Sequence, residues 1–263
     1  MRSDSREIEA ALVIGSENPQ VVASQIADLT AIGNYRLLPQ APQLIHDLYL
    51  DTPDRALQTQ QLALRVREIG TTHWVTLKGP SQPTGWEGGA ERLEIELLWS
   101  KDALARVLAE LVDRGKVPQQ RQDLDYAHPL EAMASLGLQV IQDRENHRRV
   151  RNILKGGESD SVLAELAIDS VAYHFGGQEI RQHEVEIEAK EGSSSAVIKL
   201  LVESLVAMYG PVLRRWGHSK LATGRAIEKM LSEGLLEGLL DVNNNLKPLA
   251  YDRIDDYLER SGI

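Results

Sequence analysis

The sequence has 263 residues, with 39 acidic and 29 basic side chains and a formal net charge of −10 at pH 7. A chain of this length can bury a well-developed core in one large or two small domains, and its acidic balance argues against nucleic acid or an anionic membrane as the main partner. The absence of cysteine excludes disulfides, thiolate metal sites and a cysteine nucleophile, so any metal ion must be held by oxygen or imidazole.

The first ten residues, MRSDSREIEA, lack the apolar region of a secretory signal. No apolar run approaches the ~20 residues that spanning a bilayer requires. We therefore expect a cytoplasmic protein with no membrane partner. The sequence carries no signature of a particular oligomeric state.

Short segments in which charged and aliphatic residues alternate recur along the chain, and this two-residue period predicts β-strands with one charged face. The first segment carries Glu7 and Glu9, and a strand near residue 47 follows. The remaining charged faces are, in chain order, Arg65 and Arg67; Lys78; Arg92, Glu94 and Glu96; Arg149 and Arg151; Glu165 and Asp169; and Glu184, Glu186 and Glu188. The pattern predicts eight strands.

Helical patterns lie between these segments. Predicted helices begin, in chain order, at Asn18-Pro19, Ser100, Ser193 or Ser194, and Ser219. After about Ser232 the sequence predicts helix, an Asn-rich turn and a last amphipathic helix. We expect one domain over residues 1–232 and a C-terminal helical appendage over residues 233–263.

The repeated charges point to a closed sheet with a polar interior. Pairs such as Glu7/Glu9 and Arg65/Arg67 place like charges about 7 Å apart on one strand, which is unfavourable without a partner. Closing the sheet gives all the charged faces one interior and turns the aliphatic faces outward against helices. We therefore predict an α+β fold: a closed eight-stranded antiparallel β-barrel with a charged lumen and helices packed outside.

The mixture of charges indicates the ligand. Arginine and lysine on several strands can bind the oxygens of a polyanion through charge-assisted hydrogen bonds. Clustered carboxylates would repel that polyanion unless a hard divalent cation bridged them, and Mg²⁺ or Mn²⁺ suits an all-oxygen site. A site that offers both kinds of charge is suited to a metal-bound oligophosphate, such as a triphosphate-containing small molecule or polyphosphate.

Ordered motifs across roughly residues 6–226 carry a family resemblance. EIEAALVI is similar to an E-x-E-x-K strand, YLDTPDRAL and LALRVR to a Y-x-[DE]-T-P stretch and an A-L-R-x-R strand, and THWVTLKG to a T-x-K-G strand. RLEIE, AELAID, HEVEIEAKEG and GHSKLATG match the motifs that follow. The chain thus resembles the CYTH superfamily, or triphosphate tunnel metalloenzymes, which includes inorganic triphosphatases, thiamine triphosphatases and a class of bacterial adenylyl cyclases.

The resemblance implies roles for individual residues. The implied metal ligands, for Mg²⁺ or Mn²⁺, are Glu7, Glu9, Glu186 and Glu188, with Glu94, Glu165 and Asp169 orienting these groups or contributing to metal binding. The implied phosphate-binding residues are Arg65, Arg67, Lys78, Arg92, Arg149, Arg151 and Lys220. Glu7, Glu9, Arg65 and Lys78 are the implied catalytic residues.

One departure affects the expected activity. Where the family's first motif ends in Lys, this chain has Ala11. The resemblance implies a divalent-metal-dependent hydrolase of inorganic triphosphate or an organic triphosphate. Because the Lys is missing, the chain could instead be a non-catalytic or weakly catalytic module that binds triphosphate, polyphosphate or nucleotide. A second alternative is an adenylyl cyclase of the same fold. None of the seven histidines falls at metal-ligand spacing. The residues that match the family motifs all bind phosphate or metal, so the sequence predicts no binding site for the organic part of the substrate.

Overall fold

The computed structural model describes residues 5–83, 85–86, 89–113, 124–155, 161–190 and 193–261. Hydrogen bonding links eight long strands in the order β10-β11-β1-β8-β6-β5-β4-β9 and returns from β9 to β10. Their bounds are β1 (Ser5–Ile14), β4 (Gln43–Asp51), β5 (Ala63–Ile69), β6 (Thr72–Lys78), β8 (Gly89–Leu98), β9 (Gln139–Lys155), β10 (Val162–Phe175) and β11 (Gln178–Ala189). The fold is a closed eight-stranded antiparallel β-barrel with helices, as predicted.

Short strands and helices complete the fold. The strands are β2 (Ala31–Ile32), β3 (Tyr35–Pro39), β7 (Gln82–Pro83) and β12 (Leu213–Trp216). The helices are α1 (Pro19–Ala27), α2 (Ala56–Thr59), α3 (Lys101–Asp113), α4 (Pro129–Ser135), α5 (Ser195–Tyr209), α6 (Lys220–Ser232) and α7 (Pro248–Ser261). No helix within the described ranges is long and apolar enough to cross a membrane.

Two predicted helix caps are made by serine side chains. The Ser100 hydroxyl accepts a hydrogen bond from the Ala103 amide at 3.1 Å, and the Ser219 hydroxyl accepts one from the Ala222 amide at 3.2 Å. Each bond satisfies an amide that the first turn of a helix leaves without an intrahelical partner. The cap at Ser219 fixes the start of α6, which carries Lys220.

The chain divides into two compact units. The first consists of Met1–Glu7, Leu44–Gln82 and Arg92–Glu145. Here the aliphatic sides of β4, β5 and β6 pack against α3 and α4 in a buried cluster that includes Leu64, Leu77, Leu104 and Met133. Because side chains alternate along a strand, Asp47, Arg65, Arg67 and Lys78 of these strands lie on the face away from the helices.

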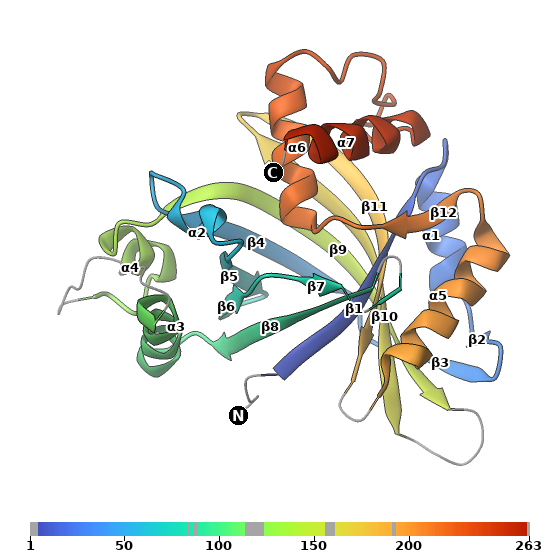
Figure 1. Ribbon diagram of the computed structural model, residues 1–263, viewed down its shortest axis with the longest axis horizontal. Coiled ribbons are helices and arrows are strands. Elements are labelled where there is room, and N and C mark those ends of the chain that lie inside the picture. The colour runs from blue at the N-terminus through green and yellow to red at the C-terminus, as the bar shows by residue number, and fades with distance from the viewer. Residues whose placement is uncertain are drawn as a thin grey trace. The chain divides into compact units, whose positions relative to one another are not determined.

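The second unit consists of Ile8–Gln43, Pro83–Glu91 and Asn146–Ile263. Its aliphatic strand face packs against α1 and α5, with Leu12, Leu166 and Ile187 meeting Ile26 and Leu201. Burying each such side chain stabilises the fold by about 1.5–3 kcal/mol. A second buried cluster joins α6 and α7, which lie against each other in Figure 1, to the other end of β10 and β11.

Candidate functional site

The charged face of the first unit forms what we call the Asp47 cluster, which consists of Asp47, Tyr49, Arg65, Arg67, Thr76, Lys78, Glu94, Glu96 and Arg144. Strand register builds it: Arg65 lies opposite Tyr49 on one side and Thr76 on the other, and Thr76 lies opposite Glu96. Directly paired residues of antiparallel strands share a face, so these side chains are neighbours.

Asp47 lies at the centre of the cluster and is almost completely buried. Arg67 donates to both carboxylate oxygens, from Nε at 2.7 Å and from Nη2 at 3.0 Å. Arg144 donates from Nη2 at 2.6 Å, and Arg65 from Nη1 at 3.4 Å. Burial alone would raise the pKa of Asp47, but Arg65, Arg67 and Arg144 outweigh it and hold the pKa well below its usual range.

The cluster has more positive than negative groups. Its four cations, Arg65, Arg67, Lys78 and Arg144, face three carboxylates, those of Asp47, Glu94 and Glu96. The positive charge of the cluster affects the Tyr49 hydroxyl. Burial would raise the pKa of Tyr49, yet Arg144 and Arg65 lower it to about 8.

A donor in this cluster is also available. Among the residues that the structure describes, the buried Nε–H of Arg65 has no hydrogen-bond acceptor. A buried donor without a partner is costly, and an incoming anionic oxygen would satisfy it. Together with its positive excess, this donor suits the Asp47 cluster to bind phosphate oxygens.

The charged face of the second unit forms the Glu186 cluster, which consists of Glu9, Arg148, Glu165, Asp169, Glu184, Glu186, Glu188, Lys190 and Lys220. Antiparallel register places its strand residues in three rows across β10, β11 and β1: Glu165, Glu188 and Glu9; Ala167, Glu186 and Ala11; and Asp169, Glu184 and Val13. Carboxylates on adjacent strands are thus direct neighbours.

Two cations hold the buried carboxylates of this cluster together. The Lys220 ammonium lies 2.5 Å from Glu186, 2.6 Å from Glu184 and 3.1 Å from Asp169. Arg148 bonds both oxygens of Asp169, at 2.8 and 2.6 Å, and Glu186 at 2.7 Å. Burial would raise the pKa of Asp169, but Arg148 and Lys220 lower it. Burial raises the pKa of Glu184 to about 8, with Glu186 adding to the effect of burial and Lys220 opposing it.

The Glu186 cluster fits a divalent cation. As defined, it contains six carboxylates and three cationic side chains, so negative charge is in excess, and its oxygen ligands match the preference of Mg²⁺ and Mn²⁺. The row of Glu9, Glu165 and Glu188 offers three such carboxylates at strand spacing. These residues would hold the metal ion.

The structure brings most of the predicted site residues into one of these clusters. Arg65, Arg67, Lys78 and Glu94 lie in the Asp47 cluster, and Glu9, Glu165, Asp169, Glu186, Glu188 and Lys220 lie in the Glu186 cluster. Arg92 is a half-buried residue of β8. The backbone of Glu7 belongs to β1, but its side chain lies outside the described residues.

Arg149 and Arg151 require a correction, because the structure does not bring them to the carboxylates. Both lie on the α1 side of β9: Arg149 Nη1 is 3.3 Å from Ser24 Oγ, and Arg151 Nη2 is 4.0 Å from Asp28 Oδ1. Arg148, one residue earlier, points to the carboxylates instead. The sequence prediction found the alternation but chose the wrong face, because β9 has polar residues on both of its faces.

Four further residues of the clusters were not predicted from the sequence: Asp47, Tyr49, Arg144 and Arg148. A usable signal existed in the two-residue spacing of Asp47 and Tyr49 and in that of Gln142, Arg144, Asn146 and Arg148, all of which are largely buried or half-buried. The second run is ambiguous because Asp143, Glu145 and His147 alternate with it.

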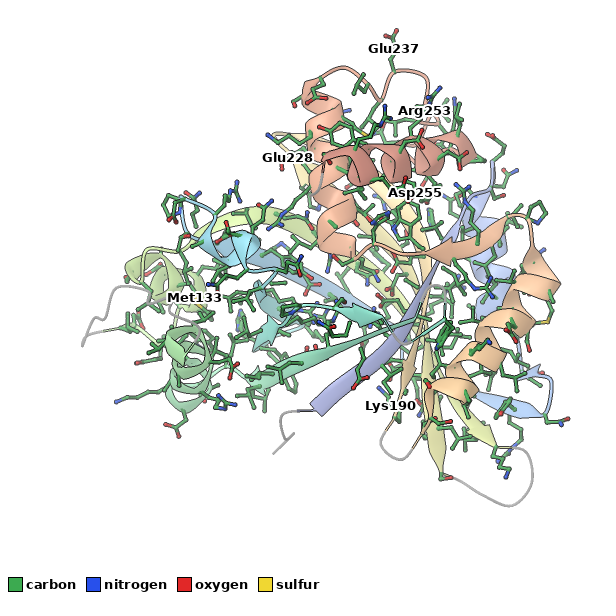
Figure 2. All side chains as sticks on the ribbon, in the orientation of Figure 1. Met133, Lys190, Glu228, Glu237, Arg253 and Asp255 are labelled. Atoms are coloured by element: carbon green, nitrogen blue, oxygen red, sulfur yellow. The ribbon has the colours of Figure 1, made fainter. Side chains whose placement is uncertain are left out.

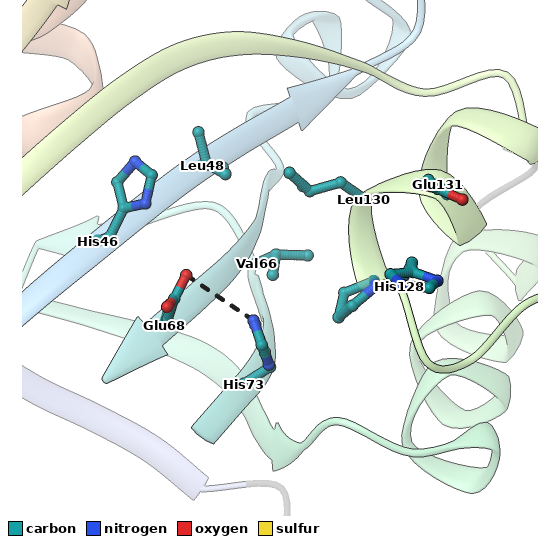
Figure 3. Close-up of a pocket in the computed structure, with 9 residues that line it drawn as sticks. His46, Leu48, Val66, Glu68, His73, His128, Leu130 and Glu131 are labelled. Carbon is teal, nitrogen blue, oxygen red and sulfur yellow. Dashed lines mark ion pairs between the residues drawn. The ribbon is translucent and has the colours of Figure 1, made fainter. Parts of the chain in front are cut away.

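A separate cavity of about 240 Å³ lies on the helix side of the first unit (Figure 3). It is lined by His46, Leu48, Val66, Glu68, His73, His128, Pro129, Leu130 and Glu131. At its edge lies a possible metal-binding group of three exposed side chains, Asp125, His128 and Glu131. Within the described ranges, this is the group whose possible ligand atoms all lie within 4.8 Å of one another. The hydrogen bond to Asp125 raises the pKa of exposed His128, which favours the protonated imidazole over the metal-binding form.

Comparisons with known proteins agree with this fold. A model of the CYTH domain matches residues 20–209. An adenylyl cyclase candidate from Hippeastrum, whose dominant activity is a triphosphatase activity, has a similar structure: the TM-score is 0.55 at 21% identity, over 84% of this chain and 96% of that one. An adenylate cyclase candidate from Bacillus halodurans gives a TM-score of 0.49 at 20% identity, over 84% and 97% of the two chains. No protein with a curated description matches the sequence. Because the CYTH model covers most of its length, the chain belongs to the CYTH domain family.

Proposed function

We propose that this protein hydrolyses a triphosphate, either inorganic triphosphate or the triphosphate group of an organic molecule, in a reaction that depends on Mg²⁺ or Mn²⁺. The observation that carries the proposal is the opposite charge excess of the two clusters. The positive Asp47 cluster suits phosphate oxygens, and the negative Glu186 cluster suits a divalent cation. A metal-bound triphosphate is a ligand that supplies both.

Roles follow from the contacts of each residue. Arg65 and Arg67 can bind phosphate oxygens with planar guanidinium groups, and Lys78 can add an ammonium, which would place the phosphorus for attack by water. Glu9, Glu165 and Glu188 would hold the metal ion, which neutralises phosphate charge when bound. Glu7, at the start of the same strand as Glu9, would take part in metal binding.

In this proposal residues 1–232 form the triphosphate-binding domain, and residues 233–263 form a helical appendage that supports it. Asn245 Oδ1 lies 3.0 Å from His183 Nε2, and the Leu246 amide donates to the Arg181 carbonyl at 2.9 Å. These bonds fix β11 immediately before Glu184. The appendage would therefore stabilise the strand that carries the carboxylates.

A second candidate function, a binding module with little turnover, is favoured by Ala11. The register places Ala11 opposite Glu186 on one side and Trp216 on the other, so the first strand presents a methyl group beside the carboxylates. The other cations of the clusters would still bind a ground-state triphosphate. Such a protein would bind a triphosphate but hydrolyse it slowly or not at all.

Product analysis separates the functions. The protein should be incubated with tripolyphosphate, thiamine triphosphate or ATP, with Mg²⁺ or Mn²⁺, and the products followed by phosphorus NMR. We expect orthophosphate from at least one substrate, and no release after chelation of the metal. Cyclic AMP and pyrophosphate from ATP would instead identify a cyclase. Saturable binding without any product would identify the binding module.

We expect Ala11→Lys to raise kcat for the best substrate by at least about tenfold, roughly 1.4 kcal/mol of barrier, while changing the dissociation constant less. An ammonium at position 11 would enter the row of Glu186 and could meet the charge that develops on phosphate oxygens during cleavage. Steady-state kinetics at matched metal concentrations measure the effect.

Ala109→Lys, on the exposed side of α3, is the matched control for the added charge. It should leave kcat unchanged. If Ala11→Lys folds and binds tripolyphosphate but turns it over no faster than the parent, the missing Lys is not what limits turnover.

A further inference from the structure

The carboxylates of the Glu186 cluster fall into two groups with different accessibility. Asp169 and Glu184 are essentially inaccessible to solvent, and both oxygens of Glu186 already contact cations, Oε1 at Lys220 and Oε2 at Arg148. The side chains of Glu165 and Glu188, in the next row, are 23% and 35% exposed. A metal ion arriving from solvent therefore reaches the row of Glu9, Glu188 and Glu165 more readily.

Lys190 provides a cation to that outer row. Its ammonium lies 3.1 Å from Glu188 Oε1 and 3.2 Å from Glu165 Oε2. The residue follows the end of β11, where Figure 2 labels it, and its amide donates to the Leu163 carbonyl at 2.9 Å. The backbone is thus fixed while the side chain, 28% exposed, remains able to move. Burial would lower the pKa of Lys190, but Glu188 and Glu165 raise it, so the ammonium is charged at neutral pH.

The ammonium of Lys190 and a hydrated divalent cation would use the same oxygens. A divalent ion carries twice the charge of the ammonium, so carboxylates that lie side by side attract it more strongly. Binding of the ion requires Lys190 to leave. Lys220 differs, because it extends from a capped helix start and is buried against three carboxylates.

We propose that Lys190 is a built-in competitor for the divalent cation: its ammonium bridges Glu165 and Glu188 when no metal is bound, and the metal displaces it from the row of Glu9, Glu188 and Glu165. The inference rests on the proposed function, since it assumes that this face binds a metal ion. It adds that metal affinity is set partly by a lysine of this chain. Removal of the lysine charge therefore strengthens metal binding.

Calorimetric titration of Mn²⁺ into the full chain, without any triphosphate, tests this. Lys190→Met keeps the aliphatic stem and should tighten Mn²⁺ binding by about tenfold, because the competing charge is gone. Lys190→Arg keeps the charge and should bind as the parent does. Lys199→Met is the matched control: Lys199 pairs with Glu203 at 3.8 Å on the exposed side of α5, and its loss changes the net charge equally without changing affinity.

Equal or weaker Mn²⁺ binding by folded Lys190→Met overturns the inference, and if the parent still binds Mn²⁺ the proposed function stands. If neither protein binds Mn²⁺, both fail. Should Lys190→Met not fold, the parent with ¹³C-methylated lysines serves instead. Saturating Mg²⁺ should change the chemical shift of the Lys190 methyl groups, and an unchanged shift in protein that binds Mg²⁺ contradicts the displacement.

Discussion

Replacing Asp47 with Asn is expected to lower the free energy of unfolding by about 3–5 kcal/mol, although the two side chains have nearly the same shape. The Asp47 carboxylate lies between Arg65, Arg67 and Arg144, and it is 1% exposed. An amide there cannot neutralise three guanidinium groups in a buried site. Denaturant unfolding at pH 7 measures the loss.

Asp143→Asn is the control for Asp47→Asn. Asp143 Oδ1 lies 2.8 Å from His46 Nε2, but the two side chains are 43% and 34% exposed, so this pair should contribute less than about 1 kcal/mol. An Asp47→Asn protein within 1 kcal/mol of the parent would contradict the described cluster.

The free energy of unfolding should also depend on pH differently in the parent and in Asp47→Asn. The native-state pKa of Asp47 is lowered, so its ionised form stabilises the fold above the ordinary Asp value of about 3.9, and this contribution is lost as the pH falls through the native-state pKa. The parent should therefore lose more stability than Asp47→Asn in acid below about pH 4.

Replacing Lys220 with Met should destabilise the protein by about 3–5 kcal/mol at pH 8, because Asp169, Glu184 and Glu186 lose a buried cation. The loss should be larger at pH 9.5. Burial raises the pKa of Glu184 to about 8 in the parent, and without Lys220 it should rise further. Stability falls as the pH rises from about 4.3 through the native-state pKa of Glu184, so the variant keeps losing stability above pH 8, where the parent no longer does.

Unfolding curves at both pH values, with Lys199→Met as the exposed control, test the account of Lys220. The control should stay within about 0.5 kcal/mol of the parent at either pH. A Lys220→Met protein that loses the same stability at pH 9.5 as at pH 8 would show that Lys220 does not hold down the pKa of Glu184.

The alternating pattern predicted all eight strands of the barrel, because a two-residue period of polar and aliphatic side chains marks them in the sequence. Arg65, Lys78 and Glu94 were found this way, since their strands have one clearly aliphatic side. Strand β9 could not be assigned equally well. Asp143, Glu145 and His147 alternate with Arg144, Asn146 and Arg148, so only the partners on β4 and β10 decide which face holds the site.

Cross-strand partners are a second feature that the sequence could not provide. Asp47 reads as one acid among aliphatic residues, and its importance comes from Arg67 opposite it and from Arg144, which is 97 residues away in the chain. Similarly, nothing local connects Lys220 to Glu184, which lies on another element 36 residues earlier. Helix α4 was missed because Pro129–Ser135 is only 7 residues long and shows less than two full periods.

Calorimetry with tripolyphosphate and Mn²⁺ tests most directly whether the two charged clusters exist to bind a metal-bound triphosphate. We expect the two ligands to bind together, each tightening the other, because one brings the negative and the other the positive charge that the clusters lack. At 100 times the dissociation constant the complex should be stabilised by about 2.7 kcal/mol and melt at a higher temperature. No heat of binding and no shift in melting temperature, with either ligand or with both, would contradict the account.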